Sequence, residues 1–381
     1  MYEEVPMDRQ TNGRSSGFSR RALMTGAAAS VGAGLLAPTA ANALAPITSA
    51  RTGKPADYSS GMNLVLLGTA GGPPPNGSRF GISSAIVVDG NVYIIDAGRG
   101  SVSQYKRADL ALASLRGIFI THLHADHVGD YFNYFLLGGN ANPNVTDSVP
   151  NSTPVFGPGP AGFLPPTFGG GESPTVNPEN PTPGLAALTE SCNQAFAYST
   201  NVFMRDSRIR DTSTLADVRE IPLDGLAVGP SSTAPAMSPL TVMEDEHVKV
   251  TAVLVPHGPV FPCFAYRFES EYGSVTFSGD TTYSDNLLTL AHDTDILVHE
   301  AINVQGWNGP AALKDHLLEG HVEVQRVGEV AQASNAARLV LSHIGDLAAG
   351  GELPEDQWRK WAKQGYEGRV DVGADLQTFR V

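Results

Sequence analysis

The ten residues from Thr121 to Asp130, THLHADHVGD, contain three histidines and two aspartates. Residues 115–121 are rich in β-branched and aromatic side chains, which predicts a buried strand just before the cluster. Residues 128–137 are mostly apolar and predict a helix just after it. Imidazole nitrogens and carboxylate oxygens are the ligands of open catalytic zinc sites. An isolated histidine pair would indicate a solvated polar loop, but these flanking elements favour a metal site.

The spacing within the cluster separates its members into two groups. His122 and His124 alternate by two, so both can point to one side of an extended turn and share a metal. Asp126 and His127 lie further along the turn and could hold a second metal a few ångströms away. The cluster therefore predicts the beginning of a dinuclear site.

A dinuclear site needs further ligands, and polar residues just past apolar runs can supply them. His257 follows the predicted strand 248–255, Asp280 follows 274–278, and His343 ends 338–342. Each alone is an ordinary turn residue, but together they complete two ligand sets. The first set is His122, His124 and His257, the second is Asp126, His127 and His343, and Asp280 would bridge. A hydroxide between two metals about 3.5–4 Å apart is a nucleophile at neutral pH.

The order of these motifs resembles a known family. HxHxDH, VPHG, SGDT, LVHEA and LSHI, in this order, resemble the metallo-β-lactamase superfamily, in its ribonuclease Z and arylsulfatase-like branch. LLGTAGGPPPNGSRFG, YIIDAGRG and DVGADLQTFRV are similar to its opening and closing strands, so the resemblance runs from about Met62 to Val381. It implies an α/β fold, the αββα four-layer sandwich, with the same seven ligands at the sheet edges. It implies two Zn²⁺ ions, with Mn²⁺ or Fe²⁺ as alternatives.

The same resemblance implies roles for residues around the metals. Asp96 would be a buried residue that orients the histidine loop. His299 and Glu300, in LVHEA, match an element near the metals of the family. His321 matches a loop histidine that assists the leaving group, although Val322 stands where the family usually has Ser or Thr. We expect Asp126 and His321 to be the catalytic residues.

Charge and spacing predict which partners bind. The formal net charge is −14, which argues against nucleic acid, because phosphate binding needs clustered Lys and Arg. In ribonuclease Z the arm that grips tRNA would lie between His257 and Asp280, but a hairpin is predicted to fill that interval. We therefore expect a small-molecule substrate and no nucleic acid. Association as a homodimer is left open.

The N-terminus resembles an export signal. Arg20 and Arg21 precede an uncharged run over residues 22–50 that is rich in Ala, Gly and Ser. This pattern predicts a twin-arginine signal peptide over residues 1–43 and a linker over 44–61. The prolines and glycines of the run make a poor spanning helix, so we expect no stable membrane anchor. The mature protein would then be periplasmic or secreted.

Residues 62–381 are predicted to form one domain from two β-rich halves, which suggests two sheets packed face to face with helices outside. Between the halves, residues 139–246 differ from the rest of the chain in amino-acid composition. Residues 138–184 are dense in Pro, Gly, Asn and Ser and predict a loop, while residues 185–204 predict a helix. We expect this insertion to be a lid or substrate arm, with a plain surface excursion as the alternative.

The leading hypothesis is an exported dinuclear zinc hydrolase that cleaves an ester-like bond in a small or medium substrate. Lactones, sulfate or phosphate esters and activated aryl compounds all suit such a metal pair. One alternative is a ribonuclease Z-type phosphodiesterase, and another is a non-catalytic metal-binding protein of the same fold. Cys192 and Cys263 match no metal-binding spacing, and we expect them to be unpaired.

Overall fold

The computed structural model describes residues 57–75, 77–139, 147–347 and 353–381. The predicted signal peptide over residues 1–43 lies outside the described residues, as does most of the predicted linker. In the part of the chain that the structure describes, no helix is both long and apolar enough to span a bilayer. Cys192 and Cys263 are both unpaired, as predicted.

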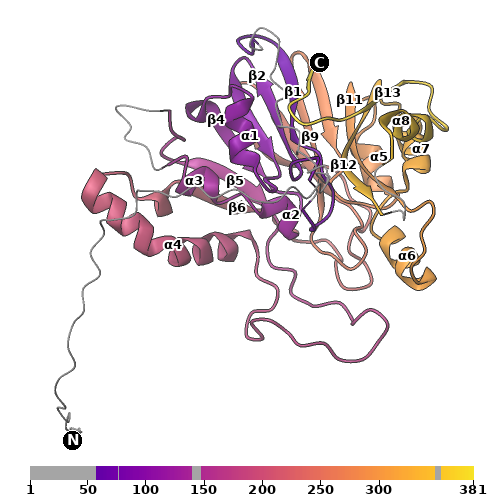
Figure 1. Ribbon diagram of the computed structural model, residues 1–381, viewed down its shortest axis with the longest axis horizontal. Coiled ribbons are helices and arrows are strands. Elements are labelled where there is room, and N and C mark those ends of the chain that lie inside the picture. The colour runs from indigo at the N-terminus through magenta and orange to yellow at the C-terminus, as the bar shows by residue number, and fades with distance from the viewer. Residues whose placement is uncertain (1–56, 76, 140–146, 348–352) are drawn as a thin grey trace, which may run out of the picture. The chain divides into compact units, whose positions relative to one another are not determined.

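Two sheets, each with seven strands within the described residues, form the centre of the fold (Figure 1). The first has the order β14 (Thr378–Arg380), β1 (Met62–Gly68), β2 (Ser83–Val88), β3 (Asn91–Ile95), β4 (Leu115–Phe119), β5 (Thr153–Gly157), β6 (Ala216–Glu220). The second has the order β13 (Arg369–Val372), β12 (Arg338–Asp346), β11 (Ile296–Asn303), β10 (Gly273–Phe277), β9 (Phe264–Ser270), β8 (Lys249–Leu254), β7 (Leu240–Glu244).

The helices are short, apart from one. They are α1 (Ser101–Arg107), α2 (Ala125–Val128), α3 (Asn133–Leu136), α4 (Leu185–Ser207), α5 (Asp285–Leu290), α6 (Ala311–Leu318), α7 (Val324–Ala333) and α8 (Glu355–Ala362), with 3-10 turns at Leu112–Ser114 and Thr212–Thr214. The single helix predicted over residues 128–137 is therefore wrong: two short helices replace it, and the first begins inside the histidine cluster.

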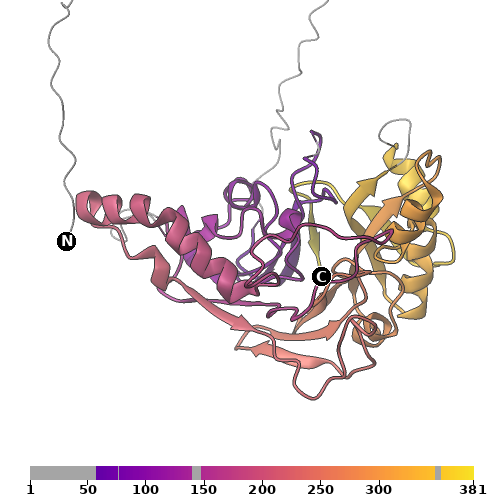
Figure 2. The ribbon, with the colours of Figure 1, turned by 90° about the horizontal axis from the view of Figure 1, so that it is seen from below.

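The two sheets face each other across an apolar core. Phe119 of β4 stacks on Phe156 of β5 and meets Tyr266 and Phe268 of β9 edge-on, at ring separations of 5.0, 5.6 and 5.0 Å. Separate clusters on the outer faces pack α1 and α3 against the first sheet and α5, α7 and α8 against the second (Figures 1 and 2). The predicted αββα sandwich is confirmed.

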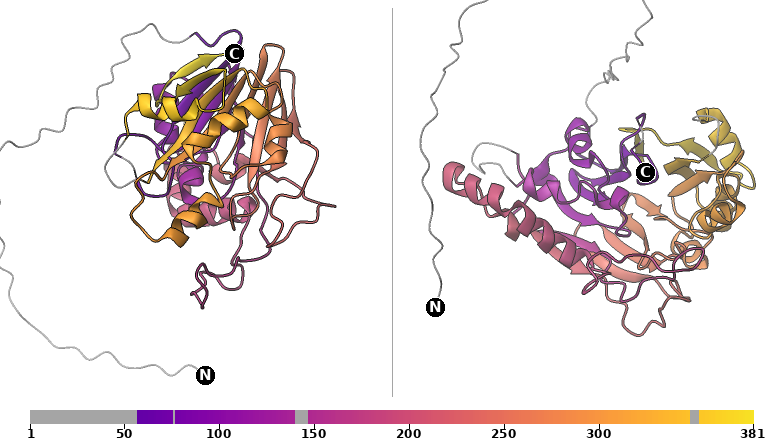
Figure 3. Two further views of the ribbon diagram at one scale, coloured as in Figure 1. Left: turned by 90° about the vertical axis from the view of Figure 1, so that its right-hand side faces the viewer. Right: turned by 60° about the horizontal axis from the view of Figure 1, so that its bottom comes forward.

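The span 139–246 contains more regular structure than its composition suggested. The helix predicted over residues 185–204 is confirmed as α4, but β5 and β6 extend the first sheet and β7 extends the second. No strand was predicted there. β5 holds a proline and a glycine, and β6 and β7 are half-exposed edge strands, so none shows the alternating pattern of a half-buried strand. Residues 158–184 remain a long segment without helix or strand (Figure 3).

Candidate metal centre

Parallel strand ends explain why the predicted ligands meet. β10 and β12 run parallel to β11, and β8 has the same direction because β9 is antiparallel to both β8 and β10. Their carboxyl ends therefore lie at one edge of the second sheet, and His257 and Asp280 follow the ends of β8 and β10. His343 was predicted just past a strand that ends at residue 342, but it lies inside β12, near its carboxyl end, where the register with β11 shifts. The first sheet contributes the loop after β4 and the start of α2, which carry the histidine cluster.

The structure brings all seven predicted ligands together in two groups. Donor atoms of the first group lie within 4.8 Å of one another, and the same holds for the second group. The first group is His122, His124, His257 and Asp280, and the second is Asp126, His127 and His343.

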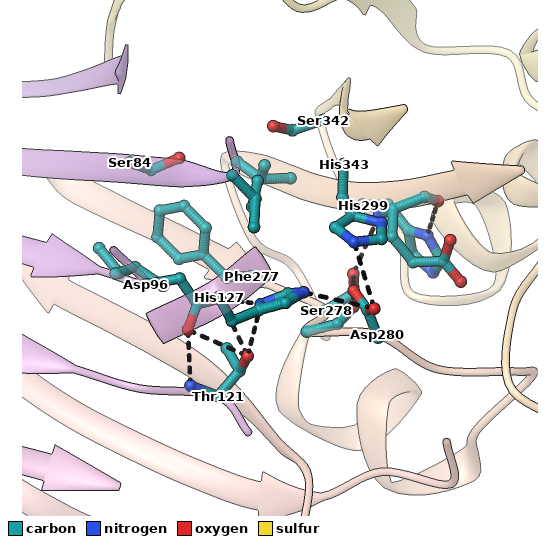
Figure 4. Close-up of a pocket in the computed structure, with 15 residues that line it drawn as sticks. Ser84, Asp96, Thr121, His127, Phe277, Ser278, Asp280, His299, Ser342 and His343 are labelled. Atoms are coloured by element: carbon teal, nitrogen blue, oxygen red, sulfur yellow. Dashed lines mark hydrogen bonds and ion pairs between the residues drawn. The ribbon is translucent and has the colours of Figure 1, made fainter. Parts of the chain in front are cut away.

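Asp280 lies between the two groups. Its Oδ2 atom is 3.9 Å from His122 Nε2 and 3.7 Å from His257 Nε2 in the first group. The same atom is 3.4 Å from His127 Nε2 and 3.3 Å from His343 Nε2 in the second (Figure 4). Two donors about 2.1 Å from a tetrahedral metal lie about 3.4 Å apart, which is close to these separations. The geometry suits a bridging carboxylate.

Buried atoms without hydrogen bonds test whether metals fit the site. His122 Nε2, His127 Nε2 and Asp126 Oδ1 are buried and have no hydrogen-bond partner among the described residues. Buried polar atoms are almost always satisfied, by protein, water or an ion. Because these three atoms belong to the two donor groups, metal ions would satisfy them, and the residues present fit a metal pair.

Hydrogen bonds behind the cluster fix its histidines. His127 donates from Nδ1 to Asp96 at 2.9 Å, so its Nε2 atom points to the donor group. Asp96 also accepts from the Thr121 amide at 2.8 Å, and it has a left-handed φ of 54° (Figure 4). His257 donates from Nδ1 to the Gly320 carbonyl at 2.8 Å. These contacts set the ring orientations of His127 and His257.

Two of these partners, Thr121 and Gly320, escaped the sequence analysis. Thr121 stands directly before the first histidine, so its position could have indicated a role in holding the cluster. Gly320 acts only through its backbone carbonyl, which no residue type reveals. His343 has a φ of 48°, a conformation that costs free energy in residues other than glycine. This strained backbone lies at a donor residue, where strain is typical of functional sites.

Charge and burial set the protonation of the donors. Burial lowers the pKa of His257 to about 3 and holds the pKa of His122 well below its ordinary value. Burial opposes ionisation of Asp280, but His343 and His127 hold its pKa well below the usual range. Burial also opposes ionisation of Asp126, but the hydrogen bond from His343 keeps its pKa at about 2. Neutral imidazoles and ionised carboxylates are the forms that bind metals. Burial opposes the charge of His127, but Asp280 and Asp96 raise its pKa well above the ordinary value, so His127 would release a proton when a metal binds.

His321 forms a third group with two of the donor residues, since one of its ring nitrogens lies within 4.8 Å of donor atoms of Asp280 and His343. His321 Nδ1 is 3.4 Å from Glu300 Oε2, and its ring centre is 4.8 Å from that of His257. The other carboxylate oxygen of Glu300 accepts from the Val322 amide at 2.9 Å. Burial lowers the pKa of His321, but the Glu300 charge outweighs it and raises this pKa to about 9. His321 is therefore protonated at neutral pH and close to the donor groups.

His299 is the predicted site residue with the least direct connection. It is buried, lies in neither donor group, and donates from Nδ1 to the Glu300 carbonyl at 2.6 Å. Its side chain lines a cavity of about 30 Å³ together with Asp96, His127, Asp280 and His343 (Figure 4). A space of this size holds water and not an organic substrate.

The comparisons with known proteins agree with this geometry. A family described as the metallo-beta-lactamase superfamily matches residues 78–144. A protein named ribonuclease Z from Mycobacterium tuberculosis (strain H37Rv) is 26% identical over 322 residues, which cover 84% of this chain and 98% of that protein. Ribonuclease Z from Mycolicibacterium paratuberculosis is 27% identical over 322 residues, with the same coverage.

Two solved structures share the fold. The metallo-β-lactamase fold protein YhfI from Bacillus subtilis has a TM-score of 0.53 and 16% identity, over 84% of this chain and 99% of that chain. Human tRNase Z, short form, has a TM-score of 0.52 and 18% identity, over the same shares of the two chains.

These names contradict the expectation that nucleic acid is not a partner. The relatives that match over 98% of their own length are named ribonuclease Z. The inference from net charge that nucleic acid is not a partner was therefore wrong. A count of side-chain charges leaves out bound divalent cations, which attract phosphate without clustered Lys or Arg. Whole-chain charge is thus a poor guide to a site that metals make positive.

The chain combines two sheets in an αββα sandwich with two donor groups at the sheet edges, and solved structures share this fold. The chain therefore has the metallo-β-lactamase fold, matches the model of that superfamily over residues 78–144, and is a metal-dependent hydrolase.

Proposed function

We propose that this protein is a phosphodiesterase of the ribonuclease Z type that uses two divalent metal ions, zinc by preference. The observation that carries the proposal is the similarity to proteins named ribonuclease Z, which covers 98% of their length. The comparisons favour this alternative over the broader ester hydrolase that headed the sequence analysis.

The proposed ligands form the same two groups as their donor atoms, one group for each metal ion. His122, His124 and His257 would hold one metal, and the second group, Asp126, His127 and His343, would hold the other. Asp280 faces both groups and would bridge them. A metal pair bound there would polarise the phosphoryl oxygen and activate water at neutral pH.

Two side chains would handle the protons. Asp126 Oδ1 has no hydrogen-bond partner among the described residues, so it would accept a hydrogen bond from the attacking water. Its pKa of about 2 makes it a weak base, which suits orientation of the nucleophile more than strong proton abstraction. His321 faces Glu300 through Nδ1, which leaves Nε2 to donate a proton to the departing oxygen.

The interval between His257 and Asp280 holds only the β9–β10 hairpin and its flanking turns, as predicted. An RNA substrate would therefore be held by other elements. The segment 158–184 is close enough to serve, because Phe163 stacks on Phe261, near His257, and Phe168 stacks on His316 of α6. We propose that this segment, which is part of the insertion over residues 139–246 predicted to be a lid or substrate arm, contributes to substrate binding.

Substrates with one common leaving group test the proposal. Bis(p-nitrophenyl) phosphate, p-nitrophenyl sulfate and p-nitrophenyl acetate all release p-nitrophenolate, so differences in kcat/KM report the preferred electrophile. We expect the phosphodiester to have the highest rate relative to its uncatalysed hydrolysis, and Asp280→Asn to abolish that activity. A transfer RNA with a 3′ extension, labelled at its 5′ end, tests the RNA substrate directly. Preference for the sulfate or the acetate, with no cleavage of RNA, would refute the phosphodiesterase.

The proposed location is outside the cytoplasm, through the twin-arginine route, and the residues concerned lie outside the described ones. Arg20→Lys together with Arg21→Lys should leave an unprocessed precursor inside the cell. Fractionation and N-terminal sequencing measure this. Undiminished mature protein outside the cytoplasm would exclude the route, and an N-terminus before residue 40 would exclude a signal peptide that ends at residue 43.

A further inference from the structure

A larger cavity opens beside the metal centre and is separate from the small one beneath it. Its volume is about 480 Å³, and it lies between the turn after β4, the segment 158–184 and the loop over residues 259–262. Small-molecule sites commonly have about 300–1,000 Å³. This cavity therefore has the size of a substrate pocket, whereas the 30 Å³ space does not.

The cavity is continuous with the first donor group. His124 lines it, and His124 Nδ1 lies 3.3 Å from Nε2 of His257, another member of that group. A substrate whose phosphoryl group lies at the metals could therefore place one of its ester groups directly in the cavity.

The lining is apolar, and its one histidine is the donor His124. Among the described residues that line it there is no Asp, Glu, Lys or Arg, and six are prolines. Leu123, Val128 and Leu188 form one side and also pack against the core of the first half, so this side is fixed. Burying a charged or strongly polar group here would cost free energy without a compensating partner.

An aromatic pair forms the opposite side. Phe163 and Phe261 stack with ring centres 5.5 Å apart and planes 17° apart, and both line the cavity. Phe168, five residues further along the same segment, stacks on His316 at 4.2 Å. The segment is thus attached to the second half of the molecule at two points, and it holds a ring surface next to the metals. Aromatic side chains favour other rings by stacking.

We propose that this cavity is the specificity pocket of the site and that it binds an uncharged ring on the non-leaving ester group of the phosphodiester. The ring belongs either to an aryl ester or to a nucleobase, which share this chemistry. The inference rests on the proposed phosphodiesterase and adds the class of group that the enzyme selects.

A series of diesters tests the pocket. Methyl, phenyl and thymidine-5′ p-nitrophenyl phosphates share a leaving group and differ only in the group assigned to the cavity. The wild-type holoenzyme should prefer the phenyl or the thymidine diester to the methyl diester by about tenfold or more in kcat/KM, chiefly through KM. Which of the two is preferred identifies the source of the ring.

Substitutions locate that preference. Phe163→Ala and Phe261→Leu should each reduce it by about tenfold, because each removes part of the ring surface. Phe163→Tyr should retain it. Tyr198→Ala is the matched control, since Tyr198 is an exposed aromatic on α4 with 84% of its surface accessible, and it should change nothing. No preference for either ring, or a preference that survives both pocket substitutions, would overturn the inference.

Binding without turnover separates this inference from the proposed function. Phenylphosphonate should bind the wild-type holoenzyme about tenfold more tightly than methylphosphonate in calorimetry, and Phe163→Ala should remove the difference. If this holds while no diester is hydrolysed, the phosphodiesterase fails and the ring pocket stands. If the diesters are hydrolysed but both phosphonates bind equally, the pocket fails and the phosphodiesterase stands.

Discussion

The metal centre and the segment 158–184 lie side by side but are built in opposite ways. The donors lie at or near strand ends and on α2, and almost all of them are buried. His127 and His257 are held by hydrogen bonds that they donate to Asp96 and to the Gly320 carbonyl, and Asp96 in turn accepts from the Thr121 amide. The segment has no helix or strand and exposes much of its length, and stacked rings attach it to the rest of the molecule. Rigid elements thus position the chemistry, while an irregular segment shapes what can approach it.

This comparison predicts the largest effect at Asp280, the residue that faces both donor groups. Asp280→Ala should lower kcat/KM by about three orders of magnitude, because the variant leaves the donor groups without their shared carboxylate. The metal content measured by elemental analysis should fall below two ions per chain, while circular dichroism should show that the variant is folded. One metal or none in metal-supplemented wild-type protein would contradict the dinuclear site.

Leaving-group dependence tests His321, which lies beside the metal donors. His321→Ala should slow diesters with alkoxide leaving groups by about 10²–10⁴-fold but affect p-nitrophenolate release little, since that group needs no proton. Steady-state rates across a series of leaving groups measure this. An equal loss for every leaving group would remove His321 from the acid role.

The pH profile gives a companion test of the same acid. Glu300 raises the pKa of His321 to about 9, so the protonated donor is lost, and the rate falls, as the pH rises through that value. Glu300→Gln removes the charge and should move this alkaline limb to lower pH, toward the ordinary histidine pKa of about 6.5. If the fall in rate at high pH does not shift in this variant, the fall belongs to an ionisable group other than His321.

A smaller effect is expected at Asp96, which touches the donors without facing a metal. Asp96→Asn should weaken metal affinity by about 10- to 100-fold, because the hydrogen bond that fixes His127 loses its charged acceptor. Competition with a chelator measures the affinity. The matched substitution Asp89→Asn, in the β2–β3 turn away from the site, should leave it unchanged.

The smallest effect on the chemistry is expected from the irregular segment. Replacing residues 165–181 with a short Gly/Ser linker should change KM and substrate preference several-fold, while both metals remain bound. The melting temperature should change by only a few degrees, because most of these residues are exposed. Loss of metal would show that the two regions are not independent.

Sequence reasoning succeeded where residues carry their chemistry in their type and order. The apolar runs that became β1, β4, β8, β11 and β12 are recognisable, because buried strands need long β-branched and aliphatic stretches. It failed at β5, β6 and β7, whose short, partly polar sequences become strands only by pairing with a neighbouring strand. The net charge of the whole chain was also a poor guide to binding partners, because a partner responds to the local charge at the site, and bound metal ions contribute to that charge.

The sequence by itself predicted the seven residues that the structure brings together, because histidines and aspartates in this order beside buried strands are typical of a metal site. Only the tertiary structure decided which atoms face one another. It places Asp280 Oδ2 between the two donor groups. It also brings Glu300 close enough to raise the pKa of His321, and it stacks Phe163 on Phe261. These contacts join residues far apart in the chain. Their distances depend on how two sheets pack, and no local pattern of residues encodes that packing.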